Sequence, residues 1–181
     1  MASSQPVEVD TTADRARAFA RLVDEHLDAA YHLAQAILRD PSEARDATHD
    51  ALIQAWRKWS SLRDPSLFRQ WFDRILVNSC RNRLQRASRW QATDISTEVG
   101  LASAEQFGRA ADDHAALGDA IATLSPDHRM VVALRFYRDL QIEEIAIRLG
   151  IPAGTVQSRL HYALKHLHRV MDAADAKGIL S

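Results

Sequence analysis

Residues 140–171 read LQIEEIAIRLGIPAGTVQSRLHYALKHLHRVM, and this stretch is the most informative about the fold. Its first part has apolar residues at helical spacing, which predicts a short amphipathic helix: Ile142, Ile145, Ala146 and Leu149. Gly150 follows where a left-handed residue commonly ends a helix, and Pro152 prevents the same helix from continuing. A second helix has an apolar arc of its own: Val156, Leu160, Ala163, Leu164, Leu167 and Val170. Two helices joined by a glycine-containing turn predict a helix-turn-helix.

The side of the second helix opposite this arc is polar and basic. Four of its side chains have hydrogen-bonding groups that suit base edges in a major groove: Gln157, Ser158, His161 and Tyr162. Lys165 and Arg169 suit phosphates. We therefore predict that this helix binds duplex DNA through eight residues: Thr155, Gln157, Ser158, Arg159, His161, Tyr162, Lys165 and Arg169. A solvated cationic helix face is the alternative interpretation of such a pattern taken alone.

A second informative stretch is LRDPSLFRQWFDRILVNSCRNRLQRASRW, residues 62–90. Its first half is aromatic and aliphatic, and we assign these side chains mostly to packing. Its second half carries amides and arginines, which suit unpaired bases and a bent phosphate backbone. Trp59 and Trp90 remain open between packing and base stacking.

Charge along the chain is segregated. The net charge is −1, which by itself argues against a nucleic-acid binder. The window 74–93, however, has five arginines and no acid, and the window 145–171 has four basic residues and no acid. The remainder of the chain is therefore acidic, and the two basic windows predict two surfaces that meet polyanions.

The whole pattern predicts an all-α protein with two small helical domains joined by a linker. Helices are expected at about 15–38 and 41–59, the second one capped by Asp40 with Pro41 in its first turn, and a third follows Asp64-Pro65. The expected organisation is a disordered tail, a three- or four-helix bundle, a linker with a helical turn near 104–110, a helix-turn-helix domain and a short tail: residues 1–13, 14–90, 91–113, 114–175 and 176–181.

The cysteine count and the lengths of the apolar runs indicate where the protein works in the cell. Cys80 is the single cysteine, which excludes an internal disulfide framework and is typical of a reducing cytoplasm. No apolar run approaches the roughly 20 residues needed to cross a bilayer, and the first residues do not resemble a secretory signal. A cytoplasmic protein without membrane insertion is expected.

Two long segments resemble the extracytoplasmic-function (ECF) sigma factors of the sigma-70 superfamily. Residues 117–171 resemble region 4 through LSPDHR, LRFYRDLQIEEIA and RLGIPAGTVQSRL. Residues 31–86 resemble region 2 through YHLAQAILRDPSEARDATHDALIQAW and FRQWFDRILVNSCRNRL. Both occur in family order, separated by a linker of plausible length.

This resemblance implies a non-enzymatic subunit, without a cofactor, that directs core RNA polymerase to promoters. Region 2 would dock on the clamp helices of the polymerase β′ subunit through an acidic face of helix 41–59: Glu43, Asp46 and Asp50. It would also capture the melted minus-10 element through four residues: Asn78, Arg81, Arg83 and Arg86. Region 4 would read the minus-35 element and touch the β flap, and an anti-sigma factor is a further expected partner.

The sequence departs from the family pattern at several positions. Gln157 and Tyr162 stand where many relatives have a basic residue, so the minus-35 preference is not transferable from a relative. Gln141 stands where Ser or Thr usually caps the first helix of the motif, which predicts a weak cap. Arg45 and His49 occupy positions that are often acidic or amide-bearing, which weakens the prediction of polymerase contacts.

Other functions fit the sequence less well. A conventional DNA-binding regulator would use the helix-turn-helix in a dimer, and a helical adaptor without a DNA role is disfavoured by the acid-free windows. Three histidines lie close together in sequence, but their spacing does not put them on one helical face as a metal site requires: His161, His166 and His168. Cys80 could have a redox role, although a buried core thiol is the simpler assignment.

Overall fold

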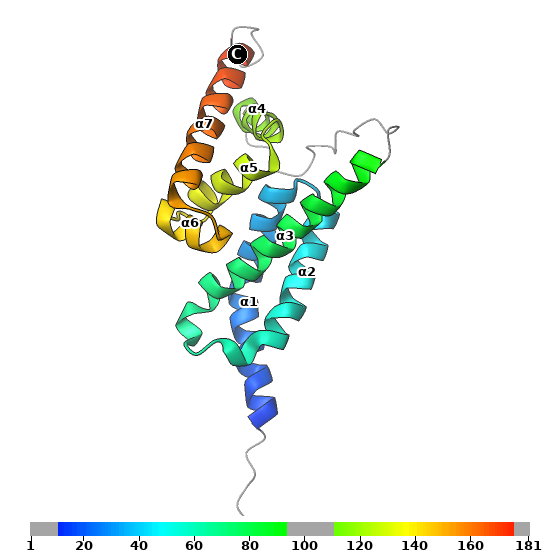
Figure 1. Cartoon of the computed structure of the whole chain (residues 1–181). Coiled ribbons are helices and arrows are strands. Elements are labelled where there is room, and N and C mark those ends of the chain that lie inside the picture. Colours follow the sequence, from blue (N-terminus) through cyan, green and yellow to red (C-terminus); the bar gives the residue numbers. More distant parts are fainter. Residues whose placement is uncertain (1–10, 94–110, 176–181) are drawn as a thin grey trace, which may run out of the picture.

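The computed structural model describes residues 11–93 and 111–175, and within these ranges all regular structure is helical (Figure 1). The prediction of an all-α fold is confirmed. The expected tails at 1–10 and 176–181, and the central part of the expected linker at 94–110, lie outside the described residues. The expected helical turn at 104–110 lies there as well.

Three helices form an N-terminal bundle, the name used below for residues 11–93. They are α1 (Thr11–Leu38), α2 (Pro41–Lys58) and α3 (Phe68–Thr93), with two short 3-10 turns between α2 and α3 at Trp59–Ser61 and Pro65–Leu67. Each helix packs against the other two. The cap predicted for α2 is present, because an Asp40 side-chain oxygen accepts a hydrogen bond from the Glu43 N–H at 2.8 Å.

The core of the N-terminal bundle combines small residues on α2 with large ones on its neighbours. The buried face of α2 consists of Thr48 and four alanines that are fully excluded from solvent: Ala44, Ala47, Ala51 and Ala55. Larger apolar side chains from α1 and α3 fill the space opposite: Leu33, Ile37, Phe68, Phe72 and Leu76. Small residues on one helix allow close approach, and the large residues then interdigitate at interior packing density.

Two tryptophans of the N-terminal bundle lie at different depths in this core. The apolar spacing of helix 41–59 predicts that Trp56 is buried with the alanines, but 44% of it is exposed and its ring packs edge-on against Phe19 at 5.2 Å. The reason is its position on α2, one residue beyond the alanine face at Ala55. Trp59, which the sequence left open, is buried among Phe19, Phe68 and Trp71. The side chain of Trp90 lies outside the described part.

Four helices and a π-helical turn form a C-terminal module, residues 111–175. They are α4 (Ala111–Ala122), α5 (Pro126–Val132), the turn η3 (Ala133–Tyr137), α6 (Ile142–Leu149) and α7 (Ala153–Asp175). Gly150 has φ 65° and ends α6, so the helix-turn-helix predicted for α6 and α7 is present. The N-terminus of α6 is not left open: the Glu144 carboxylate accepts from the Gln141 N–H at 2.9 Å. Capping from inside the helix replaces the Ser or Thr that the sequence lacks.

Some boundaries differ from those predicted. Helix α1 begins at Thr11 rather than at about Arg15, and Asp14 in its first turn suits the positive end of the helix dipole. Helix α3 continues to Thr93 and α4 begins at Ala111, so both reach into the range expected for the linker.

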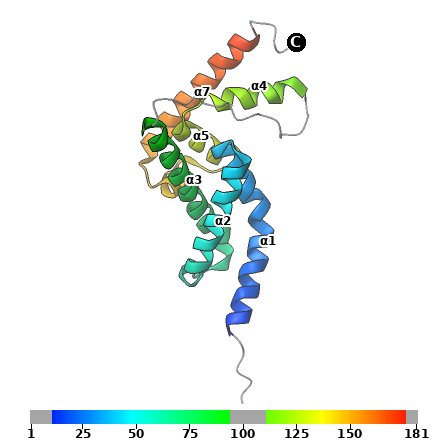
Figure 2. The ribbon, with the colours of Figure 1, turned by 90° about the vertical axis from the view of Figure 1, so that its right-hand side faces the viewer.

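The two units pack against each other, an arrangement that the sequence left open. Helix α5 and the turn η3 lie on α1, and α6 lies on α3 (Figures 1 and 2). Buried apolar side chains of the C-terminal module belong to the same continuous core as the N-terminal bundle: Met130, Leu134, Ile145 and Leu149. The described chain is therefore closed into a single body.

Candidate nucleic-acid interface

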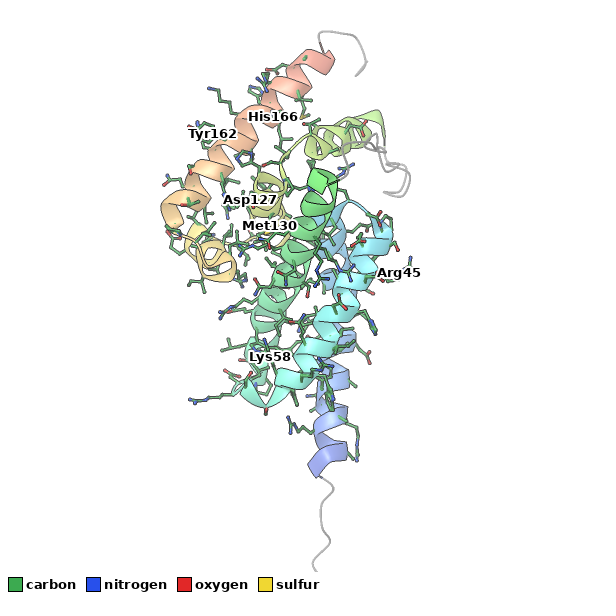
Figure 3. The ribbon with its side chains drawn as sticks, turned by 45° about the vertical axis from the view of Figure 1, so that its right-hand side comes forward. Arg45, Lys58, Asp127, Met130, Tyr162 and His166 are labelled. Carbon is green, nitrogen blue, oxygen red and sulfur yellow. The ribbon has the colours of Figure 1, made fainter. Side chains whose placement is uncertain are left out.

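Helix α7 presents the predicted DNA-binding face to solvent. Its apolar arc is buried through Val156, Ala163 and Leu167, so the helix cannot rotate without losing this contact. The opposite side carries most of the predicted set in exposed positions: Gln157, Ser158, His161, Tyr162, Lys165 and Arg169. Figure 3 shows Tyr162 on this outer side of α7, away from the N-terminal bundle. The face has the shape and chemistry that entry into a major groove requires.

Two predicted residues of α7 are less accessible. Arg159 forms an ion pair with Asp127 at the start of α5, which fixes the start of α7 against that helix. Thr155 is partly buried, and its carbonyl accepts a hydrogen bond from the Ser158 hydroxyl at 3.1 Å.

A shallow hollow of about 400 Å³ lies beside the basic end of this face. It is lined by the loop before α5 and by α7, including Tyr162, Lys165, His166 and Arg169. His166 is held in place because its Nε2 lies 2.7 Å from the Thr123 hydroxyl and its Nδ1 lies 3.0 Å from Arg169 Nη2. These contacts orient Arg169 along the edge of the predicted DNA-binding face.

The predicted minus-10 residues on α3 fall into two pairs. Asn78 and Arg86 are exposed. Arg81 and Arg83 are partly buried and already have protein partners. Arg81 Nη2 donates to the Leu149 carbonyl of α6 at 2.8 Å, so it binds the C-terminal module in the closed arrangement.

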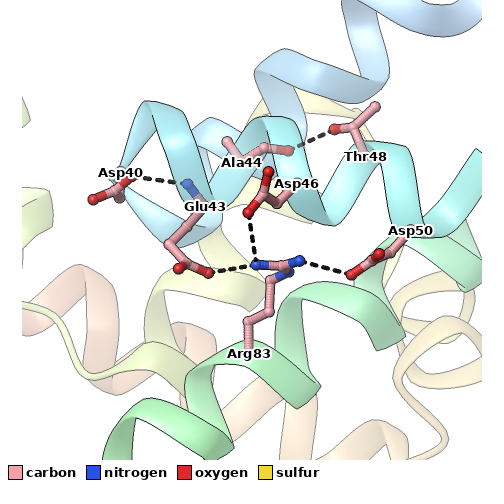
Figure 4. A network of polar contacts seen from close by, with 7 residues as sticks. All are labelled: Asp40, Glu43, Ala44, Asp46, Thr48, Asp50 and Arg83. Atoms are coloured by element: carbon pink, nitrogen blue, oxygen red, sulfur yellow. Dashed lines mark hydrogen bonds and ion pairs between the residues drawn. The ribbon is translucent and has the colours of Figure 1, made fainter.

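Arg83 binds all three acidic residues predicted to contact polymerase (Figure 4). Its guanidinium nitrogens lie 2.8 Å from Glu43, 3.5 Å from Asp46 and 2.7 Å from Asp50. Burial opposes the charge on Arg83, but the hydrogen bonds to Glu43 and Asp50 outweigh it and raise the pKa of the guanidinium. One cation from α3 thus gathers three half-exposed carboxylates of α2 into a single cluster. The sequence assigned the two sets to different partners.

The remaining sequence candidates have ordinary structural environments. Cys80 is fully buried, and burial raises the pKa of its thiol to about 12, which suits the core assignment. In residues 11–93 and 111–175, no group of three His, Cys, Asp or Glu side chains is placed to hold a metal ion. Over the same ranges no helix is long and apolar enough to span a bilayer.

Four polar residues between the two units were missed by the sequence reasoning: Asp73, Arg129, Arg138 and Arg148. Asp73 and Arg138 form an ion pair at 2.8 Å in which both side chains are almost fully buried. A signal for Asp73 exists in the sequence, since it is the one acidic residue between Phe68 and Leu84 and sits beside Phe72 on the apolar stripe. No comparable signal marks the arginines, because their burial depends on how the two units pack.

The comparisons with known proteins agree with this architecture. The family model for sigma-70 region 2 matches residues 22–90, and the model for sigma-70, region 4 matches residues 120–169. The RNA polymerase sigma-E factor of Streptomyces avermitilis is 32% identical over 161 residues, which cover 87% of each chain. The ECF RNA polymerase sigma factor SigL of Mycobacterium tuberculosis is 32% identical over 151 residues, covering 81% of this chain and 84% of that one.

Two solved structures have similar folds. The sigma factor RpoE in its complex with the anti-sigma factor NepR, from Bartonella quintana, has a TM-score of 0.70 at 24% identity and covers 85% of this chain and 96% of that chain. CnrH, solved with the cytosolic domain of CnrY, has a TM-score of 0.61 at 25% identity, covering 87% of this chain and 90% of that chain. Both domains are thus present in family order and with the family fold. The chain belongs to the ECF group of the sigma-70 family, the RNA polymerase sigma factors that direct the enzyme to promoters.

Proposed function

We propose that this sigma factor reads the minus-35 element with the outer face of α7. The observation that carries the proposal is an exposed helical face of hydrogen-bonding and basic side chains within a window free of acids. Gln157, His161 and Tyr162 would contact base edges, and Lys165 and Arg169 would contact phosphates. Thr155, Ser158 and Arg159 complete the proposed footprint at the start of the helix, with Arg159 tied to Asp127.

The exposed side of α3 that carries Asn78 and Arg86 is proposed to capture the melted minus-10 element. Asn78 and Arg86 are available on the surface of one helix; an amide suits an unstacked base, and an arginine suits the phosphate backbone. Arg81 and Arg83 belong to the same proposed site, but each must first exchange its present partner for DNA. A protein that binds only the opened strand shifts the promoter toward melting, because unpairing is costly in its absence.

The polymerase is proposed to dock on the acidic cluster of α2, through its β′ clamp helices. Glu43, Asp46 and Asp50 share one face of α2 at spacings of three and four residues and are about half exposed. A partner with cationic side chains would complement this face. The C-terminal module is proposed to touch the β flap.

An anti-sigma factor is a further proposed partner, since RpoE of Bartonella quintana was solved bound to one. We also propose that the chain works in the cytoplasm, where polymerase is found, and that it catalyses no reaction itself. Co-purification from cells grown without an inducing stress tests the anti-sigma proposal; recovery of the chain alone and already active contradicts it.

Run-off transcription with core polymerase and a promoter library tests the main proposal. We expect transcripts that start at defined sites only when the chain and core polymerase are both present. Binding of the chain alone to specific duplex sites, without any support of initiation, would instead indicate a conventional DNA-binding regulator.

A further inference from the structure

His166 of α7 joins the loop between α4 and α5 to a cation of the proposed DNA-binding face. Its Nε2 lies 2.7 Å from the Thr123 hydroxyl, and its Nδ1 lies 3.0 Å from Arg169 Nη2. The ring projects from α7 toward the end of α4 (Figure 3). Both ring nitrogens therefore have a partner, and the chemistry of the two partners determines where the imidazole carries its proton.

The hydrogen bonds assign the proton to Nε2. The Thr123 hydroxyl donates its own hydrogen to the Ala120 carbonyl at 2.7 Å, so its oxygen accepts from the Nε2–H of His166. The guanidinium of Arg169 has donors only, so Nδ1 of the same ring must accept from it. His166 is therefore neutral in this arrangement. A doubly protonated ring would place an N–H against the guanidinium and lose the contact.

The small core between α4, α5 and α7 keeps His166 close to Thr123. Five residues are buried in it: Ala120, Leu124, Val132, Ala163 and Leu167. Thr123 directly precedes Leu124, and His166 directly precedes Leu167. Moving the ring away from the hydroxyl would therefore require moving a buried leucine, which is unfavourable in a packed interior. The ring is a fixed support for Arg169.

Arg169 is held by a neutral partner and keeps its full positive charge. Arg159, near the start of the same helix, instead forms an ion pair with Asp127, which already balances its charge. Arg169 is exposed, and within the described residues no carboxylate pairs with it or lines the hollow beside it. One guanidinium N–H is used on the imidazole, and the others remain available. The cation is thus oriented without being neutralised, as a contact with phosphate requires.

Lys165 lines the same hollow as Arg169 but lacks this support. It is exposed, and it makes no hydrogen bond or ion pair with another described residue. A free lysine loses side-chain entropy when it binds a phosphate, whereas an arginine that is already ordered loses less. The two cations of one face should therefore differ in how far they depend on His166.

We propose that neutral His166 is a positioning residue, which sets the Arg169 guanidinium for a backbone phosphate of the minus-35 duplex. The loop between α4 and α5 thereby takes part in DNA binding through Thr123. Ordering the guanidinium before binding lowers the entropic cost of the contact, so His166 strengthens binding only when Arg169 is present. The inference rests on the proposed phosphate contact of Arg169.

A double-mutant cycle measures this dependence. Holoenzyme, formed from the full-length chain and core polymerase, binds a promoter duplex from which it initiates, and the affinity of each variant is measured. We expect His166→Ala to weaken binding about threefold and Arg169→Ala about fivefold. The double variant should be no weaker than Arg169→Ala alone. His166→Ala combined with Lys165→Ala should instead show the product of the single effects, because Lys165 does not use the ring.

Two further variants separate positioning from structural support. His166→Asn keeps a hydrogen-bond acceptor near the place of Nδ1, so it should restore most of the affinity that His166→Ala loses. His168→Ala is the matched control and should bind like the parent chain. His168 is exposed on the same helix and lies 3.5 Å from Asp172, outside the hollow.

Thr123→Val replaces His166→Ala in the cycle if the latter loses helicity. It removes the hydroxyl that holds Nε2–H, keeps a branched side chain in the loop, and leaves α7 unchanged. We expect weaker promoter binding in an otherwise unchanged chain, and no further loss in an Arg169→Ala background. A loss of equal size in both backgrounds contradicts the proposal.

Nitrogen NMR of the free chain reports the tautomer independently of DNA. The sequence has eight histidines, and the His166 signals are those that disappear in His166→Asn. We expect a protonated Nε2 and an unprotonated Nδ1 at neutral pH. A ring with its proton on Nδ1 cannot accept from Arg169, and this result overturns the proposal.

The outcomes distinguish this inference from the proposed function. Independent effects of His166→Ala and Arg169→Ala overturn the positioning role, and so does a His166→Asn variant as weak as His166→Ala. If Arg169→Ala binds as tightly as the parent chain, the proposed phosphate contact fails and the positioning role fails with it. A holoenzyme that initiates at no promoter rejects the proposed function itself, while the imidazole signals still decide whether His166 holds Arg169.

Discussion

Arg83 of α3 lies 2.7 Å from Asp50 of α2, and this contact joins the basic end of α3 to the acidic face of α2. The guanidinium is mostly buried, with 17% of the side chain exposed, and Glu43 and Asp46 lie on its other side. Without it, three carboxylates would face one another across one helical surface. Arg83 therefore links α3 to α2 and holds together the carboxylates of the proposed polymerase-docking face.

Arg83→Gln is expected to destabilise the chain by about 1–2 kcal/mol, because it removes the charge-assisted hydrogen bonds between Arg83 and its half-exposed carboxylate partners. Urea denaturation followed by circular dichroism measures this change. Arg86→Gln is the matched control, since Arg86 is exposed on the same helix, and it should stay within about 0.5 kcal/mol of the parent. Equal stability of the two variants would mean that the cluster around Arg83 contributes nothing.

Substitutions on α7 are expected to separate sequence reading from phosphate binding. His161→Ala should lower affinity for the preferred minus-35 sequence by about 1–3 kcal/mol and relax the preference at one base pair, because it removes a base contact. Lys165→Ala should weaken binding to all sequences alike and reduce the slope of affinity against salt by about one ion. Holoenzyme binding to a promoter library at several salt concentrations measures both. An equal loss of affinity for all promoter sequences in His161→Ala would show that His161 does not read a base.

Gly150→Ala is expected to destabilise the helix-turn-helix by about 1–2 kcal/mol, because a residue with a Cβ is strained at φ 65°. Space is not the reason, since a Cβ at Gly150 meets no atom within 4 Å. Gly154→Ala is the control: it also meets no atom, and it lies in the first turn of α7 without a positive φ. That variant should be neutral or slightly stabilised. Thermal melting of both variants measures the effect. Equal melting temperatures for Gly150→Ala and Gly154→Ala would refute backbone strain at position 150.

Cys80 is expected to resist thiol reagents in the folded chain. Its pKa of about 12 leaves almost no thiolate at pH 8, and the side chain is buried. A folded-state pKa above the unfolded value contributes stability that is complete below about pH 9 and is lost as the pH rises toward 12. Alkylation rates at pH 8 should therefore follow global unfolding when urea is added. Rapid alkylation of the native chain would show that Cys80 is accessible.

The fold could be predicted from the sequence because its signals are local. Apolar spacing located the helices, and Asp40-Pro41 and Gly150 marked where helices begin and end. The outer face of α7 followed from the same periodicity, since burying Val156 and Ala163 leaves the polar side exposed. These features depend on residues a few positions apart.

The contacts of the arginines could not be predicted in the same way. Arg81 and Arg83 were read as free cations, yet one binds a carbonyl 68 residues away and the other binds carboxylates up to 40 residues away. The pairing of Asp73 with Arg138 spans 65 residues. Contacts at such separations follow from how α3 lies against α2 and α6, which the spacing of residues within one helix does not encode.

Permanganate footprinting of a promoter is the sharpest test of promoter melting by this sigma factor, because it detects unpaired thymines at the minus-10 element. We expect reactive thymines there only when the chain and core polymerase are both added, and reduced reactivity when Asn78 and Arg86 are both replaced by alanine. Thymines that stay unreactive at a promoter to which the chain and core polymerase are both bound would contradict the proposed melting of the minus-10 element.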